Sequence, residues 1–527
     1  MTRLRLLSNS DALLALVLCV SLCWPLWIVS FPPYQDLYGH GATIEVIRRI
    51  GDYPEFERSG YIRSNACLTT LGALCTRFMS VPLFMKAIST ATVYVTSFAL
   101  LRFLRAFRQT SDLTTVLPFL PPLAHHWFIS MGMLNYSIGF AFVLLMIASA
   151  KRSASLAVSS RAIWPSALLA LGAFFCHPLP ALLGVPFALG IGYASERDAR
   201  LSRRYVLGLA PLFGTAFLSC ISLAIHFVSG PADRARIVGA GAAEGLAWND
   251  PLWVLYDAFA QSLWGMTKLS ASSLVAFFGL VYFAVSAGAA RTNPRLRVAF
   301  LVTLAIYIVT PYQAFGVYAG SPRVLLFLWP IALLAVPAKL SRGALLVTGI
   351  SAGAYVVGMN VDIFRLAKEA DHVAQGASVI PDRAKLLPLF FATRKASENT
   401  RNFDSISSMY VWLRRTNAVD VWDHSSAYPI VRVRPPPANM TRARLIAFEA
   451  KADPIAFRQD CAKRGVGIEG CAASLHALFG AFFAEAAPEY SHVLLWAPPT
   501  GTLEAAAPYY HAAFRDQELV VLERNAK

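Results

Sequence analysis

Asp36 and His40 stand four residues apart in FPPYQDLYGHGATIEVIRRI (residues 31–50), a stretch that follows a long apolar run. A carboxylate can take a proton from a hydroxyl group, and an imidazole can orient it, bind phosphate when protonated or ligate a metal. In a helix, positions 36, 40, 44 and 47 form one stripe, so Ile44 and Ile47 share the face of the two polar groups. The pattern predicts an interfacial helix lying on a bilayer, with its acid and imidazole turned toward lipid headgroups.

A simpler interpretation of the same pair also stands. Asp is a common N-cap residue, so Asp36 would only cap the helix, and His40 would be a structural histidine at the interface. Position 39 is glycine, so no capping box supports this alternative. Gly39 and Gly41 weaken a helix, but they also let a ligand or another chain approach closely.

The composition predicts a membrane around these residues. The chain has 527 residues, of which 56% are hydrophobic and 15% charged, and its mean hydropathy is +0.50. A soluble protein carries roughly 25% charged residues. Apolar runs long enough to cross a ~30 Å hydrocarbon core recur along the chain. They predict membrane-spanning helices near 12–31, 82–101, 113–131, 133–150, 162–177, 178–194, 205–228, 270–288, 298–316, 322–338 and 343–360.

Basic residues are concentrated in every second loop between these runs, which predicts the orientation. They are Arg3, Arg5, Arg102, Arg105, Arg108, Lys151, Arg152, Arg161, Arg197, Arg200, Arg203, Arg204, Arg291, Arg295, Arg297, Lys339 and Arg342. By the positive-inside rule, the N-terminus is cytoplasmic and everything after residue 360 lies outside. Much of the net charge of +16 is therefore an orientation signal, and no basic tail or aromatic-interleaved patch indicates a nucleic-acid partner.

Further polar residues of the apolar runs fall near the predicted outer ends. They are His125, His126, Asn135, His177, His226 and Arg323. Ionisable residues at membrane depth are costly and usually functional, although each alone could be structural and Arg323 could snorkel to the surface. Their shared side predicts a polar cavity on the outer face.

The tail from 361 to 527 has the mixed composition of a soluble domain. Residues 385–391, 492–498 and 519–524 read as short buried strands, and 361–375 and 405–416 as helices, so a small α/β domain is expected. Cys461 and Cys471 could pair in an oxidising compartment. The predicted fold class is an all-α polytopic membrane bundle of about eleven helices with a C-terminal extracytoplasmic α/β domain. The expected domains are 1–360 and 361–527, with 32–81 as the first outer loop.

In topology and short motifs, most of residues 1–360 resembles the GT-C class of membrane glycosyltransferases. The motifs are PPYQDLYGH (32–40), GMLNYSIGF (132–140), His177-Pro178 and Arg323 before an apolar span. PPYQDLYGH is similar to a Pro-Pro-x-x-Asp-x-x-x-His form of bacterial members. Proteins of this class take sugars from polyprenyl-phosphate carriers, and their catalytic acid lies in the first outer loop.

The resemblance implies a role for each candidate residue. Asp36 would be the general base for an acceptor hydroxyl, and His40 departs from the paired acids of better-known members. Arg323 would bind the carrier phosphate, because a guanidinium matches phosphate oxygens bidentately. His177, His126 and Asn135 would be weaker sugar or phosphate contacts. The partners would be a polyprenyl-phosphate sugar donor and a glycan, lipid or protein acceptor, at a bacterial inner membrane with the C-terminal domain in the periplasm.

Other functions and a metal site stay open at this point. A lipid-linked glycan transporter or flippase would place polar residues at span midpoints and often has repeated halves. A polymerase or ligase using pyrophosphate-linked glycans would share the gross topology, and a non-catalytic assembly protein would work through the tail. No cofactor is firmly expected. Asp36 and His40 could give a divalent metal two ligands, but no compact Cys/His cluster or double-carboxylate motif supports this.

Overall fold

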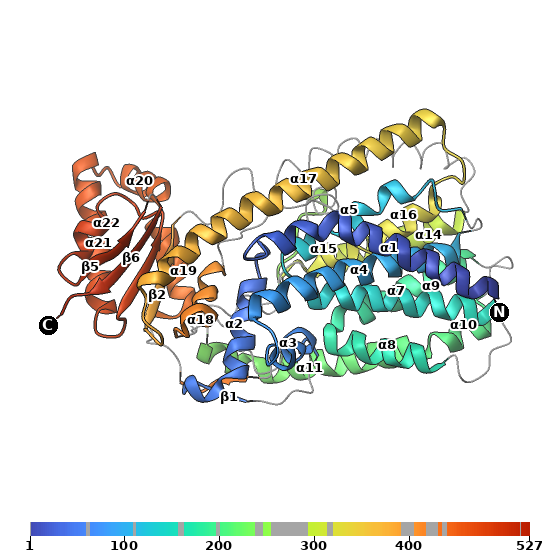
Figure 1. The fold of residues 1–527 in the computed structure, drawn as a ribbon, viewed down its shortest axis with the longest axis horizontal. Coiled ribbons are helices and arrows are strands. Elements are labelled where there is room, and N and C mark those ends of the chain that lie inside the picture. The colour runs from blue at the N-terminus through green and yellow to red at the C-terminus, as the bar shows by residue number, and fades with distance from the viewer. Residues whose placement is uncertain are drawn as a thin grey trace.

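The computed structural model describes residues 2–58, 64–108, 112–155, 163–195, 201–237, 246–253, 294–313, 320–391, 405–417, 430–434, 440–516 and 518–526. A bundle of long helices forms one part, and a small sheet with its own helices forms the other (Figure 1). The helix α17 (Arg342–Gln375) runs along the outside of the bundle and connects the two parts. The N-terminus lies at the end of the bundle that is far from the sheet (Figure 1).

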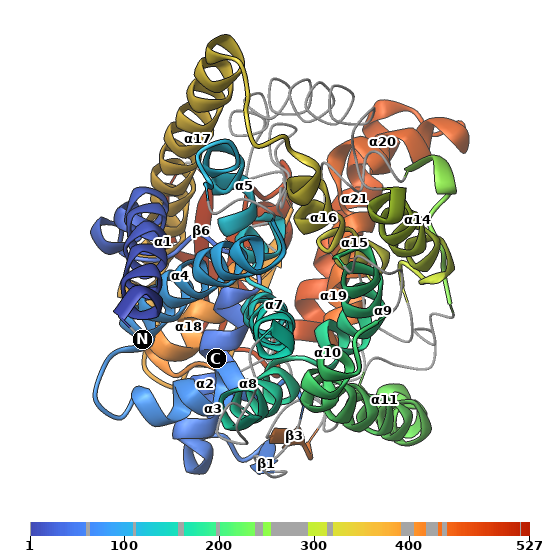
Figure 2. The ribbon, with the colours of Figure 1, turned by 90° about the vertical axis from the view of Figure 1, so that its right-hand side faces the viewer.

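The bundle is built mainly from apolar helices. They are α1 (Thr2–Ile28), α4 (Val81–Phe107), α7 (Leu134–Ser155), α8 (Ile163–Cys176), α9 (Pro178–Ser195), α10 (Arg203–Gly208), α11 (Ala210–Ile237), α14 (Pro294–Val309), α15 (Gly320–Leu325), α16 (Leu328–Ala335) and α17. Figure 2 looks along the bundle and places α7 near its centre, with α1 and α17 on one side and α9, α11 and α14 on the other. The helix α7 packs against α4, α8, α9 and α10.

Five helices in the described part are long and apolar enough to cross a membrane. They comprise Ser10–Ile28, Val81–Phe107, Leu134–Ala154, Pro178–Ser195 and Arg342–Val379. Apolar side chains cover their outward as well as their inward faces. In α1, for example, Leu13 and Val17 are 61% and 59% exposed while Ala15 and Leu22 are buried. A helix that is apolar all round is typical of a membrane span, so the chain is an integral membrane protein.

Most of the predicted spans coincide with helices of the structure. The segments 12–31, 82–101, 133–150, 178–194 and 343–360 match the five long helices, and 162–177, 205–228, 298–316 and 322–338 overlap shorter apolar ones. The predicted span 270–288 lies outside the described residues. The total of eleven spans and the orientation remain predictions.

The prediction of one continuous helix over 113–131 is wrong. This segment holds a short 3-10 turn, Leu117–Phe119, and two four-residue helices, α5 (Pro121–Ala124) and α6 (Trp127–Ser130). Pro118, Pro121 and Pro122 lack the N–H groups that a longer helix needs, and His125 leaves the helical region with φ −123° and ψ 67°. The apolar composition suggested a span, but the prolines divide it.

The C-terminal part contains a four-stranded sheet in the order β2-β4-β6-β5. Its strands are β2 (Leu386–Phe390), β4 (His492–Trp496), β5 (Tyr510–Arg515) and β6 (Leu519–Arg524). The pair β2–β4 is parallel and the other two pairs are antiparallel. The helices of this part are α18 (Met409–Arg414), α19 (Arg442–Lys451), α20 (Pro454–Lys463), α21 (Ile468–Ala486) and α22 (Thr502–Ala506). The predicted strands 385–391, 492–498 and 519–524 and the predicted α/β character are confirmed.

The sequence did not predict β5, and it left undecided whether Cys461 and Cys471 form a disulfide. β5 is half-exposed, and its sequence YHAAFR has no run of β-branched residues and carries an irregularity between Ala512 and Phe514. Cys461 in α20 and Cys471 in α21 form a disulfide. The bond joins two neighbouring helices of the C-terminal part.

The C-terminal part also reaches back to the first predicted outer loop. The loop strand β1 (Phe56–Arg58) pairs antiparallel with β3 (Ile430–Arg432). Arg383 forms an ion pair with Asp52 at 2.7 Å. The loop that carries Asp36 is thus held between the membrane helices and the C-terminal part.

Candidate active site

Asp36 stands at the entrance to helix α2 (Leu37–Arg48), eight residues after the end of α1. It occupies the N-cap position, but the described residues show no capping hydrogen bond from its side chain. Of residues 32–47, all of which the structure describes, Asp36 alone is partly exposed and the rest are buried. Asp36 is therefore the residue of this segment with the most accessible surface.

The backbone of Asp36 is fixed by the turn between α6 and α7. Its N–H donates to the carbonyl oxygen of Met131 at 2.9 Å. The next residue, Gly132, has φ +80°, and a Cβ there would lie 2.7 Å from the Leu37 nitrogen and 2.9 Å from the Asp36 nitrogen. Only glycine combines this left-handed conformation with so close an approach of two backbones.

A second contact holds the chain two residues before Asp36. The buried Tyr34 hydroxyl lies 2.7 Å from Nε2 of His125. The carbonyl oxygen of His125 accepts a hydrogen bond from the Tyr355 hydroxyl of α17 at 2.8 Å. Segments around residues 125 and 355, two distant parts of the chain, therefore hold the residues that lead to Asp36.

His40 lies one turn after Asp36, and its N–H donates to the Asp36 carbonyl oxygen at 3.1 Å. Its side chain is 4% exposed, and burial lowers the pKa of the imidazole to about 3. The ring is therefore neutral at physiological pH and does not present a charge to phosphate. The helix α2 is covered on every side from Leu37 to Ile47, so the expectation of an interfacial helix on a bilayer surface is wrong.

Helices from both ends of the chain cover α2. It packs against α3 (Cys67–Cys75), α4 and α18. The Tyr38 ring is stacked on the Trp412 ring with centres 6.2 Å apart and planes 5° apart. The amphipathic pattern correctly predicted the helix, but its polar face is turned toward protein.

Arg323 and His177 meet around Tyr136 at the start of α7. The Tyr136 hydroxyl donates to the Arg323 carbonyl oxygen at 2.6 Å, and the guanidinium carbon lies 5.4 Å from the Tyr136 ring centre. Nη2 of Arg323 lies 3.4 Å from the Met133 sulfur. The His177 ring meets the Tyr136 ring edge-on at 5.6 Å. The structure thus brings together two of the four residues that were predicted as sugar or phosphate contacts.

Asn135 and His126 have other surroundings. The Asn135 side chain accepts a hydrogen bond from Leu68 N at 3.0 Å, and its Nδ2 donates to the carbonyl and side-chain oxygens of Asn65, both at 2.9 Å. These bonds make Asn135 an anchor for the turn that begins α3. His126 is fully buried, with its ring edge-on to Phe128 and Phe140. Among the described residues, neither of its ring nitrogens has a hydrogen-bond partner.

A search of the solved structures finds a likeness over the whole chain. The crystal structure of ArnT from Cupriavidus metallidurans bound to undecaprenyl phosphate matches with a TM-score of 0.53 and 11% identity. The match covers 98% of this chain and 98% of that chain. The chain therefore shares the fold of ArnT, which is a GT-C glycosyltransferase.

The likeness to ArnT extends beyond the part that the sequence motifs had indicated. The motifs covered most of residues 1–360, whereas the structural match includes the C-terminal sheet as well. Comparisons with protein-family models and with curated proteins give no match. The likeness is therefore one of fold.

Sequence reasoning missed the role of the residues that hold Asp36. They are Tyr34, His125, Met131, Gly132 and Tyr355. Gly132, the first residue of GMLNYSIGF, was a usable signal in the sequence, because an isolated glycine between two helices indicates a positive φ or a close approach of another segment. No group of three or more His, Cys, Asp and Glu side chains in the described residues is placed to hold a metal ion.

Proposed function

We propose that the protein transfers a sugar from a polyprenyl-phosphate donor to a glycan, lipid or protein acceptor at the extracytoplasmic face of a bacterial inner membrane. The observation that carries the proposal is the fold shared with a GT-C enzyme whose crystal structure holds undecaprenyl phosphate. Residues 1–360 would form the membrane part, 32–81 the catalytic outer loop and 361–527 the extracytoplasmic domain. The alternation of basic loops supports this orientation.

In this proposal Asp36 is the general base. Its carboxylate takes the proton of the acceptor hydroxyl while the oxygen attacks the anomeric carbon of the donor sugar. The bond from that carbon to the phosphate oxygen breaks, and polyprenyl phosphate leaves with the electron pair. The position of Asp36 as the one partly exposed residue of the buried and anchored segment 32–47 suits this role, because a fixed base contributes by orientation.

Arg323 is the proposed partner of the departing phosphate. A guanidinium donates to phosphate oxygens in a fixed planar arrangement and stabilises the charge that develops on them. The Tyr136 hydroxyl of α7 donates to the carbonyl oxygen of Arg323, and this hydrogen bond ties the backbone of Arg323 to α7. The His177 ring packs edge-on against the same Tyr136 ring and would form another side of the proposed phosphate site.

The experiment compares wild-type protein, Asp36→Asn and Glu57→Gln in lipid nanodiscs. Glu57 is an exposed carboxylate of the same loop and is the matched control. Each protein receives a panel of polyprenyl-phosphate sugars with a crude acceptor extract, and the released polyprenyl phosphate is measured. We expect release by the wild type and by Glu57→Gln, and a fall of about 10²–10⁴-fold in Asp36→Asn. Equal release from all three folded proteins would refute the role of Asp36, and no release from any donor would favour a pyrophosphate-donor ligase or a transporter.

A further inference from the structure

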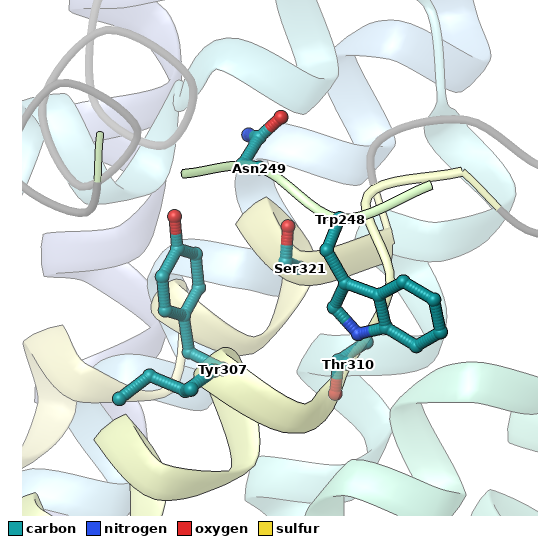
Figure 3. A pocket seen from close by; sticks show the side chains of 6 residues that line it. Trp248, Asn249, Tyr307, Thr310 and Ser321 are labelled. Atoms are coloured by element: carbon teal, nitrogen blue, oxygen red, sulfur yellow. The ribbon is translucent and has the colours of Figure 1, made fainter. Parts of the chain in front are cut away.

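A small polar hollow and a pair of thiols lie outside the candidate active site. In the hollow, between α14, α15 and the segment 246–253, the buried Ser321 hydroxyl lies among the side chains of Trp248, Asn249 and Tyr307 (Figure 3). The volume of about 10 Å³ has room for about one water, which would give this hydroxyl the partner that it lacks among the described residues. The hollow therefore suits a structural water, and the thiols are the pair with chemistry of their own.

The thiols belong to Cys67, the first residue of α3, and Cys176, the last residue of α8. The helices α3 and α8 pack side by side, and the Cys176 thiol donates a hydrogen bond to the Cys67 sulfur (Figure 2). A Cβ on Gly139 of α7 would lie 3.7 Å from the Cys176 Cβ. Cys176 is buried, whereas Cys67 is partly exposed. One thiol of the pair is therefore open to a reagent, and the other is enclosed by α3 and α7.

The pair lies on the side of the bundle that faces the C-terminal part. Figure 1 shows α3 at that end, and the same loop carries β1, which pairs with β3 of the C-terminal part. The C-terminal part itself holds the disulfide between Cys461 and Cys471. Disulfides form and persist in oxidising compartments, so the same conditions apply to both pairs of cysteines. That this side is extracytoplasmic rests on the proposed function.

We propose that Cys67 and Cys176 form a disulfide that joins the first outer loop to the end of α8. The Cys67 thiolate attacks a sulfur of an oxidant disulfide, either that of a dithiol oxidoreductase or oxidised glutathione, and one thiol leaves. The Cys176 thiolate then attacks the Cys67 sulfur of the mixed disulfide, and the second thiol leaves. The oxidant disulfide gains two electrons, and the two protons of the cysteines end on its two thiols.

The order of the two attacks follows from the surroundings of each thiol. The hydrogen bond from Cys176 lowers the pKa of the Cys67 thiol, and its place at the start of a helix favours the thiolate as well. An accessible thiol of lowered pKa is the one that meets an external oxidant. Cys176 is buried beside it and reacts only from within the protein.

The disulfide would connect two contacts of the start of α7. The residue after Cys67 donates its N–H to the Asn135 side chain at 3.0 Å. The residue after Cys176 is His177, whose ring packs edge-on against Tyr136. A bond between the two sulfurs would therefore hold the outer loop and the proposed phosphate site together across one helical turn.

Differential alkylation of the full-length protein in nanodiscs tests the proposal. Protein as isolated, and protein incubated with oxidised glutathione, is denatured in N-ethylmaleimide, then reduced and labelled with iodoacetamide. Peptide mass spectrometry then follows each cysteine. After oxidised glutathione we expect loss of the maleimide label at Cys67 and Cys176 and a crosslinked peptide in the unreduced digest. In Cys67→Ser, Cys176 should keep the maleimide label, whereas Cys75→Ser, at the other end of α3, should leave the pair unchanged.

A second thiol pair in α1 shows whether proximity alone leads to oxidation. Cys19 and Cys23 are also hydrogen-bonded to each other, but both are buried in a helix long and apolar enough to cross the membrane. They should keep the maleimide label throughout. Oxidation of Cys19 and Cys23 to the same extent as Cys67 and Cys176 would overturn the proposal.

The bond between Cys461 and Cys471 separates the remaining outcomes. Cys67 and Cys176 that stay free after oxidised glutathione, in protein whose Cys461 and Cys471 are joined, would also overturn the proposal. If Cys461 and Cys471 are free as isolated and Cys67 joins Cys176 on oxidation, the disulfide stands and the proposed orientation fails. No sugar transfer is measured, so a failure of the proposed reaction is seen separately.

Discussion

Gly132→Ala is the sharpest perturbation of the candidate active site, because it alters Asp36 without touching its side chain. The new Cβ would lie 2.7 Å from the Leu37 nitrogen, 2.9 Å from the Asp36 nitrogen and 3.2 Å from the Asp36 carbonyl carbon. These atoms belong to backbone and cannot move aside as a flexible side chain would. The turn and the start of α2 must therefore separate.

The size of the effect follows from these distances. To reach the 3.4 Å of an ordinary contact the two backbones must part by about 0.7 Å, and a misplacement of ~1 Å can cost 10²-fold in rate. We expect the release of polyprenyl phosphate to fall by about 10- to 100-fold. An alanine at positive φ costs about 1–2 kcal/mol, and loss of the bond from Asp36 N to Met131 O about 1 kcal/mol more, so the free energy of unfolding falls as well.

Gly501→Ala is the control for backbone strain. Gly501 has φ +88°, but a Cβ there meets nothing within 4 Å. We expect Gly501→Ala to lower the free energy of unfolding by about 1–2 kcal/mol and to leave the activity unchanged. In the Asp36→Asn background, Gly132→Ala should add little to the loss, since both changes act on one group. Wild-type activity in Gly132→Ala, or a full additional loss in the double variant, would refute the positioning role.

Three further outcomes can be checked by thermal unfolding. Burial lowers the pKa of His40 to about 3, against 6.5 for an ordinary histidine. The neutral ring therefore contributes fully to stability above pH 6.5, and this contribution is lost as pH falls toward 3. Between pH 7 and 4.5 the free energy of unfolding of the wild type should fall by up to about 2–3 kcal/mol more than that of His40→Gln. Replacing Cys461 and Cys471 by serine should cost the C-terminal part about 3 kcal/mol and remove its sensitivity to reductant, while donor binding stays unchanged. Asn135→Leu removes three hydrogen bonds to residues 65 and 68 and should lower the free energy of unfolding by about 2–4 kcal/mol, and Asn135→Asp should lower it by less. Equal stability of the wild type and both variants would contradict the anchoring role.

Local patterns predicted those elements whose environment is uniform. Apolar runs located the helices because a bilayer imposes one length and one polarity on every span. The strands β2, β4 and β6 were found because their buried residues form short apolar runs. The segment 113–131 was wrongly predicted as a span because its high hydropathy was given more weight than its three prolines. Without their N–H groups these prolines cannot take part in the backbone hydrogen bonds of one continuous helix.

The environment of Asp36 could be predicted only in part. The helix that begins after Asp36 was predicted correctly, because two prolines and an amphipathic pattern mark its start in the sequence, whereas the catalytic role of Asp36 stays a prediction. The burial of α2 could not be read from residues 31–50, since its cover includes Trp412, which lies more than 300 residues away. For the same reason His40, which looked like an interfacial group, is enclosed by protein.

The start of α7 links the two candidate groups of the reaction. Met131 and Gly132 hold the backbone of Asp36, Met133 and Tyr136 contact Arg323, and Asn135 holds the turn before α3. One short segment in the centre of the bundle thus sets the position of the proposed base, the proposed phosphate contact and part of the outer loop. A rigid helix is a better reference than loops for groups that must act on one substrate. A change that rotates the first turn of α7 should therefore lower activity even where Asp36 and Arg323 are both intact.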